Sequence, residues 1–153
     1  WPRASYKMSA WDTTTPRQVE VMMGACMMLR RQALDQVGVL DEQYFMYTEE
    51  VDLCYRLSAG QWEVWYVPSA RVTHYGGASS RQAAQEMFVQ LYRSKVQFYR
   101  KTGGERLARR FKWMLRLAYW PRLAGARMLA PVSQASAGQA ARYSRLLHEL
   151  AGM

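Results

Sequence analysis

The sequence has 153 residues, half of them hydrophobic, which is enough for one domain with a real core or for part of a larger one. It holds no run of about 18 uncharged apolar residues, so no membrane-spanning helix is expected. No signal peptide is expected either, because Trp1 to Arg3 lead into no apolar segment. Cys26 and Cys54 lie in apolar stretches and are expected to be buried free thiols in a reducing compartment.

The net charge of +9 is unevenly distributed along the chain. Residues 1–92 hold eight Lys or Arg and ten Asp or Glu, whereas residues 93–153 hold thirteen Lys or Arg and two acids. A near-neutral segment is therefore followed by a strongly basic one. This asymmetry predicts an anionic partner for the second segment only.

The near-neutral segment opens with an apolar run. Residues 1–17 show no hydrophobic period and are expected to be irregular. Residues 19–29 are almost continuously apolar, which is typical of a strand covered on both faces in an α/β sheet. Gly24 and Ala25 interrupt the run. Small residues inside a strand mark either a close approach by a ligand or another backbone, or a tightly packed bulge.

Two short helices and two extended segments follow, each ended by glycine or proline. The helices are predicted at residues 31–37 and 49–59, and the extended segments at residues 62–67 and 71–74. The stop signals are Gly38, Gly60, Pro68 and the glycine pair 76–77.

The basic segment is predicted to be helical. Its hydrophobic pattern indicates three helices, at residues 81–101, 105–130 and 139–150. Ser79 and Ser80 are candidate N-caps for the first, and the glycine pair 103–104 separates it from the second. Pro121 is expected to kink or restart the second helix, and the small residues 131–138 are expected to be a linker.

Carboxylates concentrate in residues 48–56, whose sequence is TEEVDLCYR. The threonine is a candidate N-cap, and Glu49 and Glu50 would lie in the first helical turn, where the helix dipole favours negative charge. Asp52 and Arg56 are one turn apart and are predicted to pair. By itself this pattern is typical of any well-capped helix start.

The same stretch, preceded by DEQYFMY at residues 41–47, resembles the acceptor-side motif of inverting family 2 glycosyltransferases. Three further stretches fit that family in the same order. They are GACMMLRR at 24–31, VGVLDE at 37–42 and YVPSARVTHYGG at 66–77. Together they extend over residues 17 to about 80, and they are most similar to bacterial rhamnosyltransferase-like enzymes that act on lipid-linked glycans.

The resemblance implies an α/β fold of the GT-A (nucleotide-diphospho-sugar transferase-like) type. Residues 1–80 would be its acceptor-side part, and residues 81–153 a basic amphipathic helical tail. The family's N-terminal nucleotide-binding half, with its Asp-x-Asp metal motif, is not matched, and the chain contains no Asp-x-Asp. We therefore expect a partial fold, from a fragment or a truncated gene product, and the chain alone is expected to be inactive.

The implied reaction moves a sugar, rhamnose among the candidates, from a nucleotide-diphosphate donor to a glycan or polyprenyl-linked acceptor, with inversion. Glu50 occupies the position of the family's catalytic base, which takes the proton from the acceptor hydroxyl. Glu49 would contact the acceptor or shape its pocket. Gly24 and Ala25 lie in the segment that borders the acceptor pocket in the family.

The remaining implied site residues support the helix or bind metal. Asp52 and Arg56 would hold the carboxylate helix in place. The family implies Mg²⁺ or Mn²⁺ to carry charge on the leaving diphosphate. His74 occupies the position where many members place a metal-binding histidine, although a lone histidine is more often structural. The glycine pair 76–77 would let a loop close over the diphosphate, or it forms an ordinary turn.

The tail around residues 105–130 is typical of a basic amphipathic helix. Arg109, Lys112 and Arg116 share one face, and Trp113 and Trp120 lie near the apolar one. Such a helix suits a membrane surface. A packed helix with a solvated basic face is the alternative, and nucleic acid is not expected as a partner because no nucleic-acid motif accompanies the charge.

The sequence leaves two alternative functions open. The first is the acceptor-binding part of a metal-dependent, membrane-associated glycosyltransferase of cell-wall or polysaccharide biosynthesis, cytoplasmic and peripheral on the inner face of the cell membrane. The second is a non-catalytic module whose basic helices bind anionic lipid or nucleic acid. An upstream segment with alternating strands and helices and an Asp-x-Asp would decide for the first.

Overall fold

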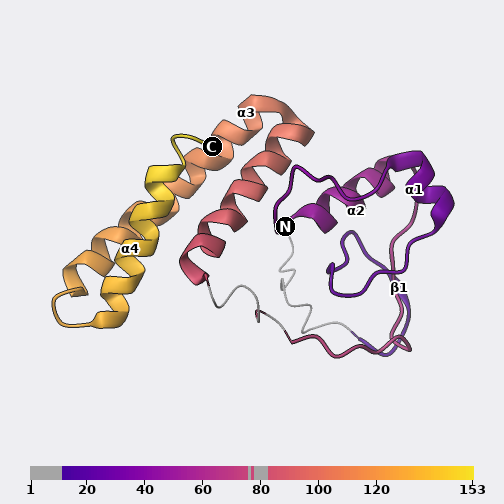
Figure 1. Cartoon of the computed structure of the whole chain (residues 1–153), viewed down its shortest axis with the longest axis horizontal. Helices are drawn as coiled ribbons and strands as arrows, with labels where there is room; N and C mark the ends of the chain where they lie inside the picture. The colour runs from indigo at the N-terminus through magenta and orange to yellow at the C-terminus, as the bar shows by residue number, and fades with distance from the viewer. Residues whose placement is uncertain (1–11, 76, 78–82) are drawn as a thin grey trace. The chain divides into compact units, whose positions relative to one another are not determined.

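The computed structural model of the chain describes residues 12–75, 77 and 83–153. These residues form two compact units, whose elements are labelled in Figure 1. The mixed unit holds the residues up to Leu40 together with Glu50–His74, and the helical unit holds Asp41–Glu49 and the residues from Tyr75 onward. The expected domain division at residue 80 stays a prediction.

The mixed unit is built on two helices, α1 (Arg31–Val37) and α2 (Glu49–Ala59). Both were predicted from the sequence, and Gly38 and Gly60 follow their last residues as expected. Their apolar faces meet in a small core. It consists of Ala33, Leu53 and Leu57, with Met27, Leu34, Val37, Trp62 and Val64 packed around them.

The sheet of the mixed unit is limited to two residues on each strand. β1 (Arg17–Gln18) pairs antiparallel with β2 (Trp65–Tyr66). The strand predicted at residues 62–67 is thus confirmed only at its centre, and residues 71–74 have no regular secondary structure. Within the described residues, the α/β part of the chain is mostly helix and loop.

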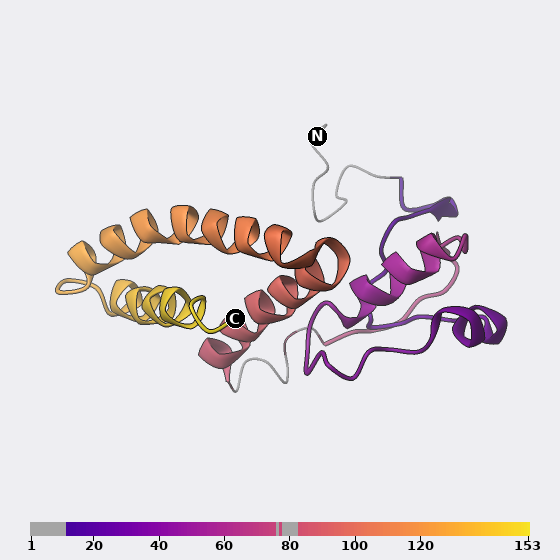
Figure 2. The same cartoon turned by 90° about the horizontal axis from the view of Figure 1, so that it is seen from above.

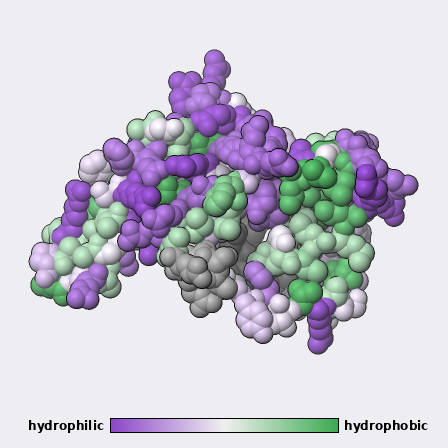
Figure 3. All heavy atoms as spheres, in the orientation of Figure 1, coloured by the Kyte–Doolittle hydropathy of each residue, from purple (hydrophilic) through white to green (hydrophobic). Residues whose placement is uncertain are grey.

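The prediction of a doubly covered strand at residues 19–29 is wrong for this structure. These residues form turns and irregular chain, and Met23 and Met28 are exposed. A strand buried on both faces needs neighbouring strands and covering helices, and the described residues supply only the short β2 as a partner. Cys26 is likewise exposed, which corrects the expectation that it is buried, whereas Cys54 is a buried free thiol as predicted. Figure 3 shows hydrophobic surface gathered over the part that holds α1 and α2.

The helical unit begins its regular structure with α3 (Ala84–Leu129), which runs as two arms joined at Gly104. The backbone of Gly104 has φ 72 and ψ −179, a conformation that glycine adopts without a steric penalty. A side chain at Gly103 would meet Leu107 at 2.3 Å, so the turn needs both glycines. The predicted break is confirmed, and Figure 2 shows the two arms folding back on each other. The candidate caps Ser79 and Ser80 lie outside the described residues.

The last helix, α4 (Gln134–Glu149), packs along the second arm of α3 (Figure 2). The predicted linker at residues 131–138 is too long, because Ser133 accepts a hydrogen bond from the N–H of Ser136 and caps the helix there. Alanines dominate the following turn and favour helix. The interface between these helices is apolar. Its buried residues are Leu115, Leu123, Ala126, Ala140, Leu146 and Leu150.

An aromatic cluster joins the first arm of α3 to the second arm and to α4. Phe88 and Tyr92 from the first arm meet Tyr119 edge to face, with ring centroids 5.9 and 5.5 Å away, and Tyr143 of α4 closes the group. The hydroxyls of Tyr92 and Tyr119 hydrogen-bond to each other. Burial and this hydrogen bond raise the pKa of Tyr92, so its hydroxyl stays protonated at neutral pH.

Of the two outcomes expected at Pro121, the restart does not occur, because α3 continues through the proline. A kink at Pro121 stays a prediction. Within the described part of α3, non-helical backbone angles occur at Gly104. Pro121 has no backbone N–H and so cannot donate to the carbonyl one turn back. Next to this missing hydrogen bond, the Arg122 guanidinium donates to the carbonyl of Ala118. Packing of Leu123 and Ala126 against α4 holds the arm in register.

Candidate functional site

The carboxylate pair lies at the start of α2, as the sequence predicted. Glu49 is the first residue of the helix and Glu50 the second. Acidic side chains are typical of this end of a helix, where backbone N–H groups lack helical partners. Both side chains are partly buried.

The backbone leading into this helix is strained. Tyr47 has φ 68 and Thr48 has φ 75, both in the left-handed region that side chains disfavour. The conformation is a genuine outlier for a β-branched residue such as Thr48, which is also buried. Strain of this kind persists only where surrounding contacts over-determine it, and it clusters at functional sites. The chain thus enters the carboxylate pair through an unusual turn.

The side chain of Glu50 lies beside the backbone of Gly24. A β-carbon added to Gly24 would lie 3.6 Å from Cβ of Glu50 and 3.9 Å from its Cγ. A side chain at position 24 would therefore lie in ordinary van der Waals contact with the side chain of Glu50. The structure brings these two predicted residues together, and Ala25, the next residue, is exposed.

Glu49 carries an unsatisfied carboxylate oxygen. Its Oε2 is buried and has no hydrogen-bond partner in the described part of the chain. An unpartnered buried carboxylate oxygen is rare and calls for an explanation, such as a missing ligand or water. This feature has no signature in the sequence.

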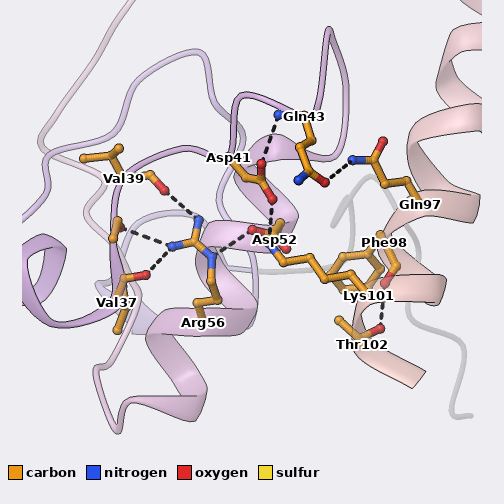
Figure 4. A network of polar contacts seen from close by, with 11 residues as sticks. Val37, Val39, Asp41, Gln43, Asp52, Arg56, Gln97, Phe98, Lys101 and Thr102 are labelled. Carbon is orange, nitrogen blue, oxygen red and sulfur yellow. Dashed lines mark hydrogen bonds and ion pairs between the residues drawn. The ribbon is translucent and has the colours of Figure 1, made fainter. Parts of the chain in front are cut away.

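Asp52 and Arg56 form the predicted ion pair, with 2.8 Å between Nε of Arg56 and Oδ2 of Asp52. Asp52 is fully buried. The two terminal nitrogens of Arg56 donate to three consecutive backbone carbonyls at the end of α1 (Figure 4). These carbonyls belong to Val37, Gly38 and Val39. Arg56 thus ties α2 to the end of α1, a contact that sequence spacing did not reveal.

Cys54 lies one turn beyond Glu50 and is fully buried. Burial raises the pKa of its thiol, the negative charge of Glu50 adds to the rise, and a backbone hydrogen bond from Met22 opposes it. A neutral thiol is a poor nucleophile. Burial and a raised pKa are typical of a structural cysteine.

His74 is exposed. No group of three or more His, Cys, Asp or Glu side chains among the described residues is arranged to hold a metal ion. His74 would therefore supply one ligand, and the described residues do not complete a metal site around it. Gly77 has φ 75, a conformation suited to a turn, whereas Gly76 lies outside the described residues.

The loop before α2 is fastened to the first arm of α3, both within the helical unit. The hydroxyl of Ser94, which is fully buried, donates to the carbonyl of Met46 at 2.7 Å. Lys101 forms an ion pair with Asp41 at 2.8 Å, and Gln97 contacts Gln43 at 3.4 Å (Figure 4). Sequence analysis missed these contacts because they join positions about 50 residues apart, with no pattern to link them.

A comparison with protein-family models matches residues 6–93, more than half of the chain, to the family described as glycosyltransferase like family 2. The chain belongs to this family. The match contains the carboxylate pair, Gly24, the Asp52–Arg56 ion pair and His74. The resemblance inferred from the sequence is thereby confirmed.

Curated relatives match the chain over shorter segments. An N-acetylglucosaminyl-diphospho-decaprenol L-rhamnosyltransferase of Mycobacterium tuberculosis is 42% identical over 84 residues, 52% of this chain and 27% of its own length. The rhamnosyltransferase WbbL of Escherichia coli is 34% identical over 70 residues, 46% of this chain and 26% of its own length. A low-salt glycan biosynthesis hexosyltransferase of Haloferax volcanii is 42% identical over 40 residues, 26% of this chain and 13% of its own length.

The chain spans about a quarter of the length of the two rhamnosyltransferases. No solved structure matches it.

Proposed function

We propose that this chain is the acceptor-side part of an inverting glycosyltransferase with a partial GT-A fold. Residues 1–80 would contribute the acceptor site, and residues 81–153 would form its basic helical tail. The observation that carries the proposal is the position of Glu50, at the start of α2 beside the backbone of Gly24, in a chain of glycosyltransferase like family 2. The donor site lies largely outside this chain.

In the proposed reaction Glu50 is the catalytic base. Its carboxylate takes the proton from an acceptor hydroxyl while that oxygen attacks the anomeric carbon of the donor sugar. The bond from the anomeric carbon to the nucleoside diphosphate breaks with its electron pair, and attack from the opposite face inverts the configuration.

The neighbours of Glu50 receive the acceptor. The buried, unpartnered oxygen of Glu49 is suited to accept a hydrogen bond from a sugar hydroxyl. We place Gly24 and Ala25 beside the acceptor, where the absence of large side chains would let a sugar ring approach Glu50. Asp52 and Arg56 touch no substrate in this scheme, and they hold α2 against the end of α1.

A divalent cation, Mg²⁺ or Mn²⁺, would neutralise charge on the leaving diphosphate, as is common in the family. We propose His74 as one ligand. The described residues do not complete its site, so no step above depends on the ion.

The names of the relatives narrow the substrates. Two are rhamnosyltransferases, and one of these is named for a decaprenol-linked acceptor. We therefore propose a nucleotide-diphosphate rhamnose as donor and a polyprenyl-linked glycan as acceptor, at the cytoplasmic face of the cell membrane.

The experiment compares Glu50→Gln with the unchanged protein in its full natural length, with acceptor turnover and nucleoside diphosphate release as the readouts. Loss of the base should lower kcat at least about a hundredfold while the circular dichroism spectrum is kept. Glu20→Gln, an exposed carboxylate of the same unit, is the matched control and should retain activity. Near-normal turnover of Glu50→Gln together with loss of turnover in Glu49→Gln would show that the catalytic base is Glu49 and that our assignment to Glu50 is wrong.

A further inference from the structure

The second arm of α3 presents an apolar stripe to solvent. Trp113, Leu117 and Trp120 are 62%, 55% and 60% exposed. Their spacing of four and three residues places them on one side of the helix. Met128, 81% exposed, continues the stripe about two turns further on. We call these four residues the tryptophan stripe.

The stripe is not the core-facing side of the helix. Leu115, Leu123 and Ala126 of the same arm are buried against α4, and their positions on the helix lie opposite the stripe. The arm therefore packs against α4 on one side and exposes two tryptophans, a leucine and a methionine on the other. Exposed apolar surface of this kind marks an interaction site.

Basic side chains accompany the stripe, and acidic ones are absent. Residues 106–148 contain nine Lys or Arg and no Asp or Glu. Arg106 and Arg110 extend the stripe at its N-terminal end, about two turns and one turn before Trp113. Arg109, Arg116 and Arg127 follow one flank at seven- and eleven-residue intervals. The partner must therefore be apolar along a line and negatively charged beside it.

We propose that the tryptophan stripe is a docking surface for an anionic lipid bilayer. Tryptophan rings settle at the headgroup level of a membrane, leucine and methionine insert just below it, and arginines pair with anionic headgroups. No described helix has a segment apolar and long enough to cross a bilayer. In this proposal the exposed side of the arm faces the membrane surface, with α4 on the side away from the lipid.

Charge and chemistry favour a membrane over other partners. A second copy of this face would bring like charges together along the whole arm, which opposes self-association. Nucleic acid would pair with the arginines and its bases could stack on the tryptophans, but it offers no apolar interior for Leu117 and Met128. The inference concerns binding alone and does not rest on sugar transfer, so failure of either proposal leaves the other standing.

The test is co-sedimentation of the full chain with phosphatidylcholine vesicles, with and without phosphatidylglycerol, at low and high salt. We expect binding to the anionic vesicles that salt weakens. W113S/W120S should lower the partition coefficient at least about tenfold, because each ring loses its apolar transfer energy, whereas W113F/W120F should retain most of it. R109Q/R110Q should lose about tenfold on anionic vesicles and little on neutral ones.

The matched control is Trp65→Ser. Trp65 is 48% exposed but lies in β2 of the mixed unit, so this change should leave vesicle binding unaltered. Equal loss in Trp65→Ser and W113S/W120S would overturn the assignment to the stripe. Absence of binding to anionic vesicles would overturn the proposal. In that case, binding to nucleic acid, or a dimer that W113S/W120S disrupts, would identify another partner for the stripe.

Discussion

At the scale of single residues, the helix start at Glu49 and Glu50 combines three features that packing alone does not require. The two preceding residues are held in the left-handed region, one carboxylate oxygen is buried without a partner, and a glycine lies beside Glu50. The strained backbone and the unpartnered oxygen each cost free energy of folding. Their coincidence at one helix start is what a binding site for a polar ligand requires.

The ion pair of Asp52 and Arg56 should be the most costly one to break in the mixed unit. Asp52→Asn leaves the Arg56 guanidinium without its counter-charge in a site where Asp52 is fully buried. Loss of one partner of a buried pair costs about 3 kcal/mol or more. Urea unfolding of the two proteins measures the difference.

The control for this change is built into the same unit. Arg31 and Asp35 form an ion pair with the same spacing and the same 2.8 Å distance, but both side chains are largely exposed. Asp35→Asn should change the free energy of unfolding by about 0.5 kcal/mol or less. Equal effects of the two substitutions would show that Arg56 does not hold α2 in place.

The proposed metal role of His74 predicts a shift in metal dependence. His74→Ala in the full-length enzyme should raise the Mn²⁺ concentration for half-maximal turnover about tenfold or more, because one ligand is lost. Turnover at saturating Mn²⁺ should recover substantially. His148→Ala, an exposed histidine of α4 outside the family match, is the control. An unchanged metal requirement in His74→Ala would remove His74 from the site.

At the scale of elements, α3 has two roles, one in each of its arms. Its second arm exposes the tryptophan stripe, and its first arm fastens the loop that leads into α2 through the buried hydroxyl of Ser94. Ser94 also accepts a hydrogen bond from Gln90 at 3.0 Å. The break at Gly103 and Gly104 lets one chain segment take both positions.

Ser94→Ala should therefore destabilise the helical unit by about 1–3 kcal/mol, because the carbonyl of Met46 loses its donor in a buried position. Urea unfolding followed by far-ultraviolet circular dichroism gives the magnitude. Ser58→Ala, at an exposed position near the end of α2, should be nearly silent. A Ser94→Ala protein as stable as the parent would mean that the loop is not held by this hydrogen bond.

At the scale of the whole molecule, the two units differ in how completely they bury apolar surface. The helical unit closes a core between α3 and α4 and an aromatic cluster between the arms. The mixed unit leaves much of residues 19–29 exposed, although their composition suits a buried strand. The chain spans about a quarter of its rhamnosyltransferase relatives, and strands that could flank this run are absent from the described residues.

Local signals in the sequence determined the helices and their ends. The 3.6-residue period placed α1, α2 and both arms of α3, and Gly38, Gly60 and the glycine pair 103–104 marked where they stop. The spacing of Asp52 and Arg56 predicted their pairing, and motif order identified the family. These features depend on neighbours within a few residues or on inherited patterns, so the sequence alone suffices for them.

Long-range contacts decided the rest. Whether residues 19–29 form a strand depends on partners that the run itself does not specify, and whether Pro121 restarts a helix depends on packing against α4. The donors to Met46 and to the carbonyl of Val39 come from positions far away in the sequence. The exposure of the tryptophan stripe is likewise tertiary, because periodicity shows that a helix has an apolar face but not which apolar residues find a partner.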